Sequence, residues 1–265
     1  MARPAHRAQR DDMTIASIGW NPAATNQRFY EALWSRARLT SPERFNTWPL
    51  LSRLSTTRRR RVELGPGLHP RLPLDETLFI DGSAAAVSGL RDAGADALRG
   101  DLTALPLENA SVDLACAFDV IEHVGDDETL LAEVSRVLAN DGVFVMSVPL
   151  HPHRWTEFDG TVGHIRRYEP RALIRMLARH EITVIRSACF GMKPADGWLT
   201  RLALRQLNRH FDEAMDWYNR WLMPIALWRQ KPLQFAEGLA DPCAFDDVVL
   251  HCRRIPRTSA RTRCD

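Results

Sequence analysis

The central part of the chain alternates between short apolar runs and segments whose apolar residues recur every three or four positions. The periodic segments predict helices near 83–93, 127–138 and 169–179. The apolar runs predict seven strands, near 61–65, 77–81, 97–100, 112–118, 142–148, 182–190 and 247–254. Strands that alternate with helices form a parallel sheet covered on both faces. The pattern therefore predicts an α/β fold, a Rossmann-like, doubly wound and mostly parallel seven-stranded sheet.

Helical segments flank this core. Asn21 followed by Pro22 is a typical helix start, and a second helix is expected from Ser41-Pro42. The roughly 55 residues between the last two predicted strands are too many for a plain loop. We expect one domain over 13–256, with N-terminal helices over 20–57, a helical insertion over about 192–245, and disordered tails at 1–12 and 257–265.

The predicted insertion carries tryptophans at helical spacing, including Trp217, Trp221 and Trp228. Such spacing usually marks a packed core. Two other interpretations are a lid that forms an apolar pocket over a substrate and, more weakly, contact with a membrane surface.

Composition narrows the classes of function. A formal net charge of +2 over 265 residues disfavours a nucleic-acid partner. No apolar run is long enough to span a bilayer, and the polar N-terminus is unlike a secretory signal. Five cysteines without CxxC spacing indicate reduced thiols. These features predict a cytoplasmic protein with no integral membrane contact.

Candidate chemistry begins where the first predicted strand ends in Glu63-Leu64-Gly65-Pro66-Gly67 and the second ends in Asp81-Gly82. Closely spaced glycines let the backbone approach a small polar ligand, and a carboxylate at the next strand end can hold both hydroxyls of a ribose. A dinucleotide fingerprint would need a third glycine at position 70, where the chain has Pro70. A nucleoside cofactor other than NAD is therefore expected.

Five motifs follow one another within residues 60–180: Val62 to Gly67, Asp81, Gly100 to Pro106, Phe118 to Val124, and Leu131 to Leu138 followed by Asp141-Gly142. In this order they resemble the motifs of class I S-adenosylmethionine (SAM)-dependent methyltransferases of the small-molecule, type 11-like group. The resemblance implies SAM as the cofactor. The contacts expected with it are Glu63, Gly65, Pro66, Gly67, Asp81, Gly82, Ser83, Asp101, Leu102, Phe118 and Asp119.

Structural roles compete with these assignments. Glu63 can orient the ammonium group of SAM or brace the glycine turn as a buried acid, and Asp81 and Asp101 can be helix or turn caps. Only fourteen positions separate Gly67 from Asp81, with two prolines between them, so the first crossover helix is expected to shrink to a turn. We expect another group to take part of its role at the SAM carboxylate, with Arg71, Tyr30 and Arg44 as candidates.

The segment after the fifth predicted strand is dense in titratable and aromatic side chains, at the strand ends where ligands of open α/β sheets bind. His151 and His153 are the leading candidates for a general base, ahead of His123 and His164. Expected acceptor contacts are Trp155, His164, Arg166, Arg167 and Tyr168. The last three have an equally good interpretation as braces of the loop. The spacing of His151, His153 and His164 matches no standard pattern, so no metal site is expected.

The sequence thus predicts an enzyme that transfers the SAM methyl group to oxygen, nitrogen or carbon of a small-molecule acceptor and releases S-adenosylhomocysteine. One alternative keeps the cofactor and attacks its aminobutyrate chain, releasing methylthioadenosine. A second is a SAM-binding protein without catalytic activity, and a third, an NAD-dependent dehydrogenase, is disfavoured by Pro70.

Overall fold

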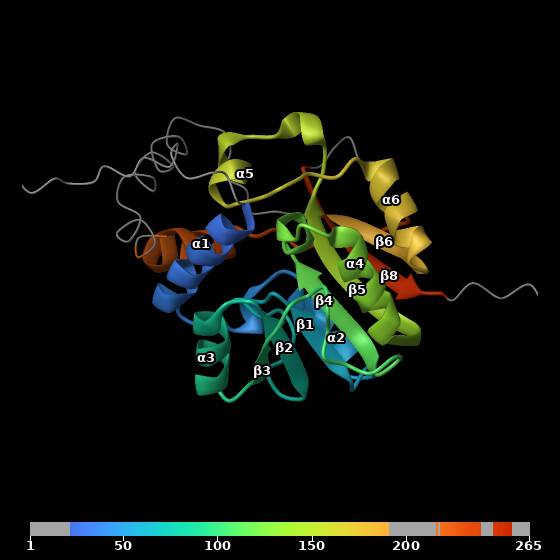
Figure 1. The fold of residues 1–265 in the computed structure, drawn as a ribbon, viewed down its shortest axis with the longest axis horizontal. Helices are drawn as coiled ribbons and strands as arrows, with labels where there is room; N and C mark the ends of the chain where they lie inside the picture. Colours follow the sequence, from blue (N-terminus) through green and yellow to red (C-terminus); the bar gives the residue numbers. More distant parts are fainter. Residues whose placement is uncertain (1–21, 191–215, 217, 240–245, 256–265) are drawn as a thin grey trace, which may run out of the picture.

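The computed structural model describes residues 22–190, 216, 218–239 and 246–255 (Figure 1). Both predicted tails and most of the predicted insertion lie outside these residues. From the insertion, the structure describes a short π-helical turn at Tyr218–Leu222 and helix α9 at Met223–Trp228.

The sheet has eight strands in the order β3-β2-β1-β4-β5-β8-β6-β7. The first five in this order pair in parallel, and β8 lies antiparallel between β5 and β6. The bounds are β1 Arg61–Leu64, β2 Thr77–Asp81, β3 Asp96–Arg99, β4 Val112–Phe118, β5 Leu138–Pro149, β6 Ile182–Phe190, β7 Ala236–Glu237 and β8 Asp247–Arg254. All seven predicted strands are confirmed.

The structure has one strand, β7, that the sequence did not predict. Its two residues are exposed and pair antiparallel with Arg186 and Ser187 of β6. Two exposed residues carry no hydrophobic period, so the sequence pattern could not reveal this strand.

Three of the helices between strands agree with their predicted ranges: α3 at Ala84–Asp92, α4 at Asp127–Val137 and α6 at Pro170–Arg179. Helix α1 spans Pro22–Arg36, as the Asn21-Pro22 pair predicts. The second N-terminal helix is a correction: Pro42–Arg44 forms only a 3-10 turn, and α2 spans Trp48–Ser55. The short helix α5 spans Glu157–Thr161. None of the described helices combines the length and apolar character needed to cross a membrane.

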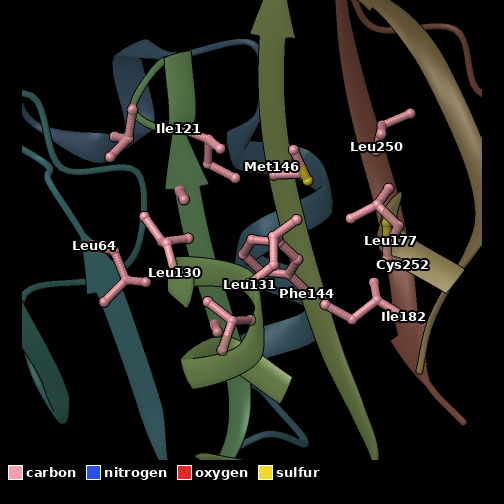
Figure 2. Close-up of a cluster of buried hydrophobic side chains, with 14 of the residues drawn as sticks. Leu64, Ile121, Leu130, Leu131, Phe144, Met146, Leu177, Ile182, Leu250 and Cys252 are labelled. Atoms are coloured by element: carbon pink, nitrogen blue, oxygen red, sulfur yellow. The ribbon is translucent and has the colours of Figure 1, made fainter. Parts of the chain in front are cut away.

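Helices α4 and α6 cover one face of the sheet and build the larger part of the core (Figure 2). Leu130 and Leu131 of α4 pack against Phe144 and Met146 of β5, and all four are fully buried. Leu177 of α6 joins the same cluster. This packing fixes the carboxyl ends of the central strands, where the candidate site lies.

Helix α2 covers part of the opposite face of the sheet, where a helix between β1 and β2 would otherwise pack. No helix lies between β1 and β2, as the short, proline-containing connection predicts. Leu50 and Leu51 of α2 instead pack with Leu72 of that connection and with Leu114 of β4. A helix that precedes β1 in the chain therefore shields the surface that a crossover helix would have covered.

Glu63 of β1 braces the irregular connection. Its side chain is 1% exposed and accepts hydrogen bonds from the backbone amides of Arg71, at 2.9 and 3.0 Å, and Leu72, at 2.9 Å. Burial raises the pKa of Glu63 to about 7, although the amides and the Arg71 charge oppose that rise. The carboxyl group thus holds the chain where backbone helix bonds are lacking.

The core packing predicts a large loss of stability for Leu131→Ala. Removing this fully buried side chain leaves a cavity under β5, and we expect the free energy of unfolding to fall by about 2–5 kcal/mol. Urea denaturation measures it. The control is Ile225→Ala, at a side chain that is 51% exposed, with an expected change within about 0.5 kcal/mol. Equal losses in both variants would contradict the packing.

The Glu63 brace predicts a specific pH dependence. Between pH 4.5 and about 7 the unfolded chain has released the Glu63 proton while the folded chain keeps it, so this group's contribution to stability declines as pH rises. Glu63→Gln removes the titration. We expect the wild-type free energy of unfolding, minus that of the variant, to decrease across this window in urea denaturation at several pH values. A difference that is constant or rises with pH would show that Glu63 is not buried as described.

Candidate functional site

The turn after β1 depends on glycine at two positions. Gly65 and Gly67 have φ of 62° and 56°, a region that side chains disfavour. The Gly65 amide donates to the Ile80 carbonyl at 2.8 Å, and a Cβ on Gly65 would lie 2.8 Å from Val120 Cγ2. The turn therefore lies tightly between the ends of β2 and β4.

Asp81 joins this turn to the end of β2. One carboxylate oxygen accepts the Gly67 amide and the other accepts the Ser83 amide, each at 2.8 Å. The side chain is only 7% exposed, and burial raises the pKa of Asp81 against the opposing effect of the amides. Each oxygen retains a second lone pair, so Asp81 can fix the turn and still accept from a ligand hydroxyl.

The end of β3 lies next to Asp81. The Gly100 amide donates to the Asp81 carbonyl at 3.1 Å. Asp101 is exposed and caps its own turn, accepting from the amide and the hydroxyl of Thr103 at 2.9 and 2.7 Å, which lowers the pKa of Asp101. Leu102 is partly buried beside it. Asp101 and Leu102 thus lie beside the end of β2. Asp101 already caps its own turn, which is the structural role that competes with adenine binding.

Three residues were expected to bind the carboxylate of SAM, and of these Arg71 lies beside a predicted cofactor residue, Phe118. Its guanidinium lies 3.6 Å from the Phe45 ring centroid and 5.5 Å from that of Phe118 at the end of β4. The residue is 6% exposed. Arg44 is exposed on the 3-10 turn, and Tyr30 contacts His123. A buried cation between aromatic rings is a suitable group for an anionic ligand atom.

Helix α1 lies against the glycine turn after β1 and against the start of α3 after β2. The sequence did not reveal these contacts. The Glu31 carboxylate accepts from the Ser83 hydroxyl at 2.8 Å and from the amides of Ala84 and Ala85 at 2.9 and 3.0 Å. The Trp34 ring packs on Gly67 so closely that a Cβ there would lie 2.1 Å from it. A hydrophobic period locates a helix but does not say which loop it covers.

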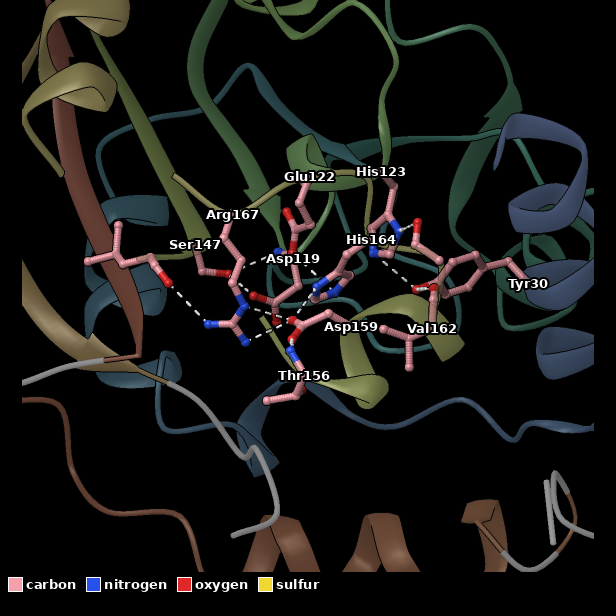
Figure 3. A network of polar contacts seen from close by, with 12 residues as sticks. Tyr30, Asp119, Glu122, His123, Ser147, Thr156, Asp159, Val162, His164 and Arg167 are labelled. Atoms are coloured by element: carbon pink, nitrogen blue, oxygen red, sulfur yellow. Dashed lines mark hydrogen bonds and ion pairs between the residues drawn. The ribbon is translucent and has the colours of Figure 1, made fainter. Parts of the chain in front are cut away.

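A buried ion pair holds the loop after β5, where the sequence analysis expects the acceptor. Asp159 accepts from Arg167 Nε at 2.9 Å and Nη2 at 2.7 Å, and from the Thr156 amide and hydroxyl at 2.7 and 2.8 Å (Figure 3). Burial alone would raise the pKa of Asp159, but hydrogen bonds from His164, Arg167 and Thr156 outweigh it and hold that pKa well below its usual range. Arg167 also donates to the Leu150 carbonyl at 3.0 Å.

The neighbours of Arg167 are tied to the protein as well. Arg166 pairs with Asp127 and donates to the Gly125 carbonyl, and the Tyr168 hydroxyl donates to Asp127 at 3.0 Å. Burial raises the pKa of Tyr168. All three side chains thus have the loop-bracing contacts that competed with acceptor binding in the sequence interpretation.

The other predicted residues of the loop after β5 differ in exposure. His151 is buried with φ of 62°, and its ring centroid lies 5.4 Å from that of the exposed His153. Trp155 is 44% exposed. At the end of β4, Asp119 also has a positive φ, and its carboxylate accepts from the Ser147 hydroxyl at 2.7 Å.

The ring partner of His164 is His123, with 4.8 Å between centroids, and both lie beside Glu122 (Figure 3). Burial raises the pKa of Glu122 well above its usual value and lowers that of His123 to about 3. Sequence reasoning ranked His123 low and gave Glu122 no role. The available signal was the adjacent acid and imidazole directly after a strand end.

The comparisons with known proteins agree with this geometry. Residues 66–146 match the model of a methyltransferase-domain family. Over 54 residues the chain is 46% identical to a probable SAM-dependent methyltransferase of Mycolicibacterium smegmatis, covering 20% of this chain and 21% of that protein. Over 76 residues it is 33% identical to a probable SAM-dependent methyltransferase of Mycobacterium tuberculosis, covering 28% of each. The matched segments thus span less than a third of these relatives.

Solved structures show the same fold over more of the chain. A SAM-dependent methyltransferase from Thermotoga maritima superposes with a TM-score of 0.53 at 17% identity, covering 79% of this chain and 90% of that one. A proposed sarcosine dimethylglycine methyltransferase from Galdieria sulphuraria gives 0.54 at 12% identity, covering 90% and 100%. Its strand order, its glycine turn and the match over residues 66–146 thus make the chain similar to class I SAM-dependent methyltransferases.

Proposed function

We propose that this protein transfers the methyl group of SAM to a small-molecule acceptor and releases S-adenosylhomocysteine. The observation that carries the proposal is the junction at Asp81, which joins the glycine turn to the end of β2. A backbone free of Cβ atoms next to a carboxylate with spare lone pairs suits the methionine and ribose parts of SAM.

In this arrangement the methionine half of SAM lies at Gly65 to Gly67, and its carboxylate faces Arg71. The ribose hydroxyls donate to Asp81, and the adenine lies near Asp101 and Leu102. Trp34 covers Gly67 in the structure, so its ring moves aside when the cofactor enters. Glu31 caps the start of α3, and α1 can close again over the bound nucleoside.

The chemistry requires alignment more than activation, because the sulfonium is already a good leaving group. The acceptor approaches from the loop after β5, at the same edge of the sheet. The attacking atom, the methyl carbon and the sulfur must be in line. An acceptor that loses a proton needs a base within reach, and His151 and His153 are our candidates on this loop.

Attack on the aminobutyrate chain remains the rival reaction. The observation that favours this rival is that no helix lies between β1 and β2, where a helix N-terminus would otherwise hold the SAM carboxylate. Mass spectrometry of the spent cofactor separates the two: S-adenosylhomocysteine supports methyl transfer, and methylthioadenosine supports the rival. Tight SAM binding without consumption across a broad acceptor panel would favour a binding protein.

Asp81→Asn tests the proposed cofactor site. An amide at this position loses the charge and one acceptor oxygen, so we expect the dissociation constant for SAM to rise at least about tenfold in calorimetry. The control is Asp92→Asn, at an exposed acid near the end of α3, with unchanged affinity expected. Melting curves establish that both variants are folded. A folded Asp81→Asn protein with wild-type SAM affinity would refute this placement of the ribose.

A further inference from the structure

We propose that Glu122, His123 and His164 bind a divalent transition-metal ion at the acceptor side of the site. Each residue offers one ligand atom, and these atoms all lie within 4.8 Å of one another (Figure 3). The sequence interpretation had grouped His164 with His151 and His153 and expected no metal. The structure brings together a different set of side chains.

The first argument is the carboxylate of Glu122. The residue is completely buried, and neither of its oxygens has a hydrogen-bond partner in the described part of the chain. A buried polar group without partners is costly and rare in folded proteins. One Glu122 oxygen lies 3.9 Å from His164 Nε2, which is too long for a hydrogen bond but leaves room for an ion between them. A cation would satisfy this carboxylate.

The second argument is the orientation of the two imidazoles. His164 Nδ1 lies 3.0 Å from a carboxylate oxygen of Asp159, and His123 Nδ1 lies 3.1 Å from the Gly163 carbonyl. Both neighbours are acceptors, so each Nδ1 carries the hydrogen and each Nε2 presents a lone pair. Metal-binding histidines are commonly oriented in this way, by a carboxylate or a backbone carbonyl behind the ring.

The loop-bracing ion pair gives this arrangement its rigidity. The Asp159 oxygen that accepts from His164 also accepts from Arg167, and the other oxygen is held by Thr156. His164 is therefore aimed at Glu122 by a buried network rather than by a mobile surface contact. The network acts as a positioning device, and Arg167 contributes to it without touching the ion.

The ligand set favours an ion such as Zn²⁺ over Mg²⁺ or Ca²⁺, because two of its three atoms are imidazole nitrogens. Bonds of about 2.0–2.2 Å in a tetrahedral site would bring the ligand atoms to about 3.3 Å from one another, so the widest separation must shrink by up to about 1.5 Å. The Tyr30 hydroxyl now lies 3.1 Å from His123 Nε2 and 3.3 Å from the Val162 carbonyl. When His123 Nε2 binds the metal, the Tyr30 hydroxyl would still be able to donate to the Val162 carbonyl.

Three protein ligands leave at least one position open. Glu122 and His123 follow closely after β4, at the sheet edge where the acceptor is expected, and His164 reaches them from the chain between α5 and α6. An acceptor hydroxyl bound there would lose its proton more readily, because a metal ion stabilises the oxyanion. Selection of an oxygen acceptor by the metal ion rests on the proposed methyl transfer. The binding of the ion is independent of that proposal.

Zinc and cobalt titrations of the full-length, chelator-treated protein test the site. We expect calorimetry to give one Zn²⁺ per chain and Co²⁺ to produce visible absorption typical of nitrogen and oxygen ligands. Glu122→Gln and His164→Gln should each weaken Zn²⁺ binding more than about tenfold. The matched control is His180→Gln, which removes an imidazole that is 2.6 Å from Glu128 and outside the cluster, and should leave binding unchanged.

Folding and cofactor binding are measured on the same samples. Glu122→Gln removes a buried carboxylate that has no hydrogen-bond partner within the described ranges, so its metal-free melting temperature should equal or exceed that of the wild type. Added Zn²⁺ should raise the melting temperature of the wild type but not of this variant. Absence of stoichiometric binding, or equal affinity in Glu122→Gln, would overturn the proposal. SAM calorimetry is separate: intact metal binding without SAM binding would instead contradict the proposed function.

Discussion

The carboxylate of Asp81 is the contact on which the rest of the site depends. With its two oxygens it holds the Gly67 amide of one loop and the Ser83 amide of another. The chain between β1 and β2 has no helix to stiffen it, so buried carboxylates replace helical backbone bonds there. Glu63 holds the middle of the connection and Asp81 its beginning. A short, irregular crossover can thus still present a rigid glycine turn.

The loop after β5 follows the same principle. Asp159 is surrounded by donors from Thr156, His164 and Arg167, and it fixes a loop that has little regular structure. Three buried acids therefore have clear backbone or side-chain partners. Glu122 is the exception, because it is fully buried and neither of its oxygens has a hydrogen-bond partner among the residues that the structure describes. In a site where every other buried carboxylate discussed is satisfied, that contrast is what makes Glu122 a ligand-binding candidate.

The sequence predicted the sheet well because buried strands leave continuous apolar runs, and it located Asp81 because strand ends share one edge. It placed the second N-terminal helix too early: Pro42 forms only a 3-10 turn, while Pro49 lies in the first turn of α2. It could not place Trp34 over the glycine turn or Glu31 at the start of α3, since both contacts depend on the docking of α1. Nor could it pair His164 with His123, which lies 41 residues earlier and is brought near only by the fold.

The most direct measurement is a crystal structure of the protein with bound S-adenosylhomocysteine. The account predicts that the homocysteine part lies against Gly65 and Gly67, that both ribose hydroxyls lie within hydrogen-bond distance of Asp81, and that the Trp34 ring has left Gly67. A nucleoside lodged elsewhere, with Trp34 still packed on Gly67, would contradict it.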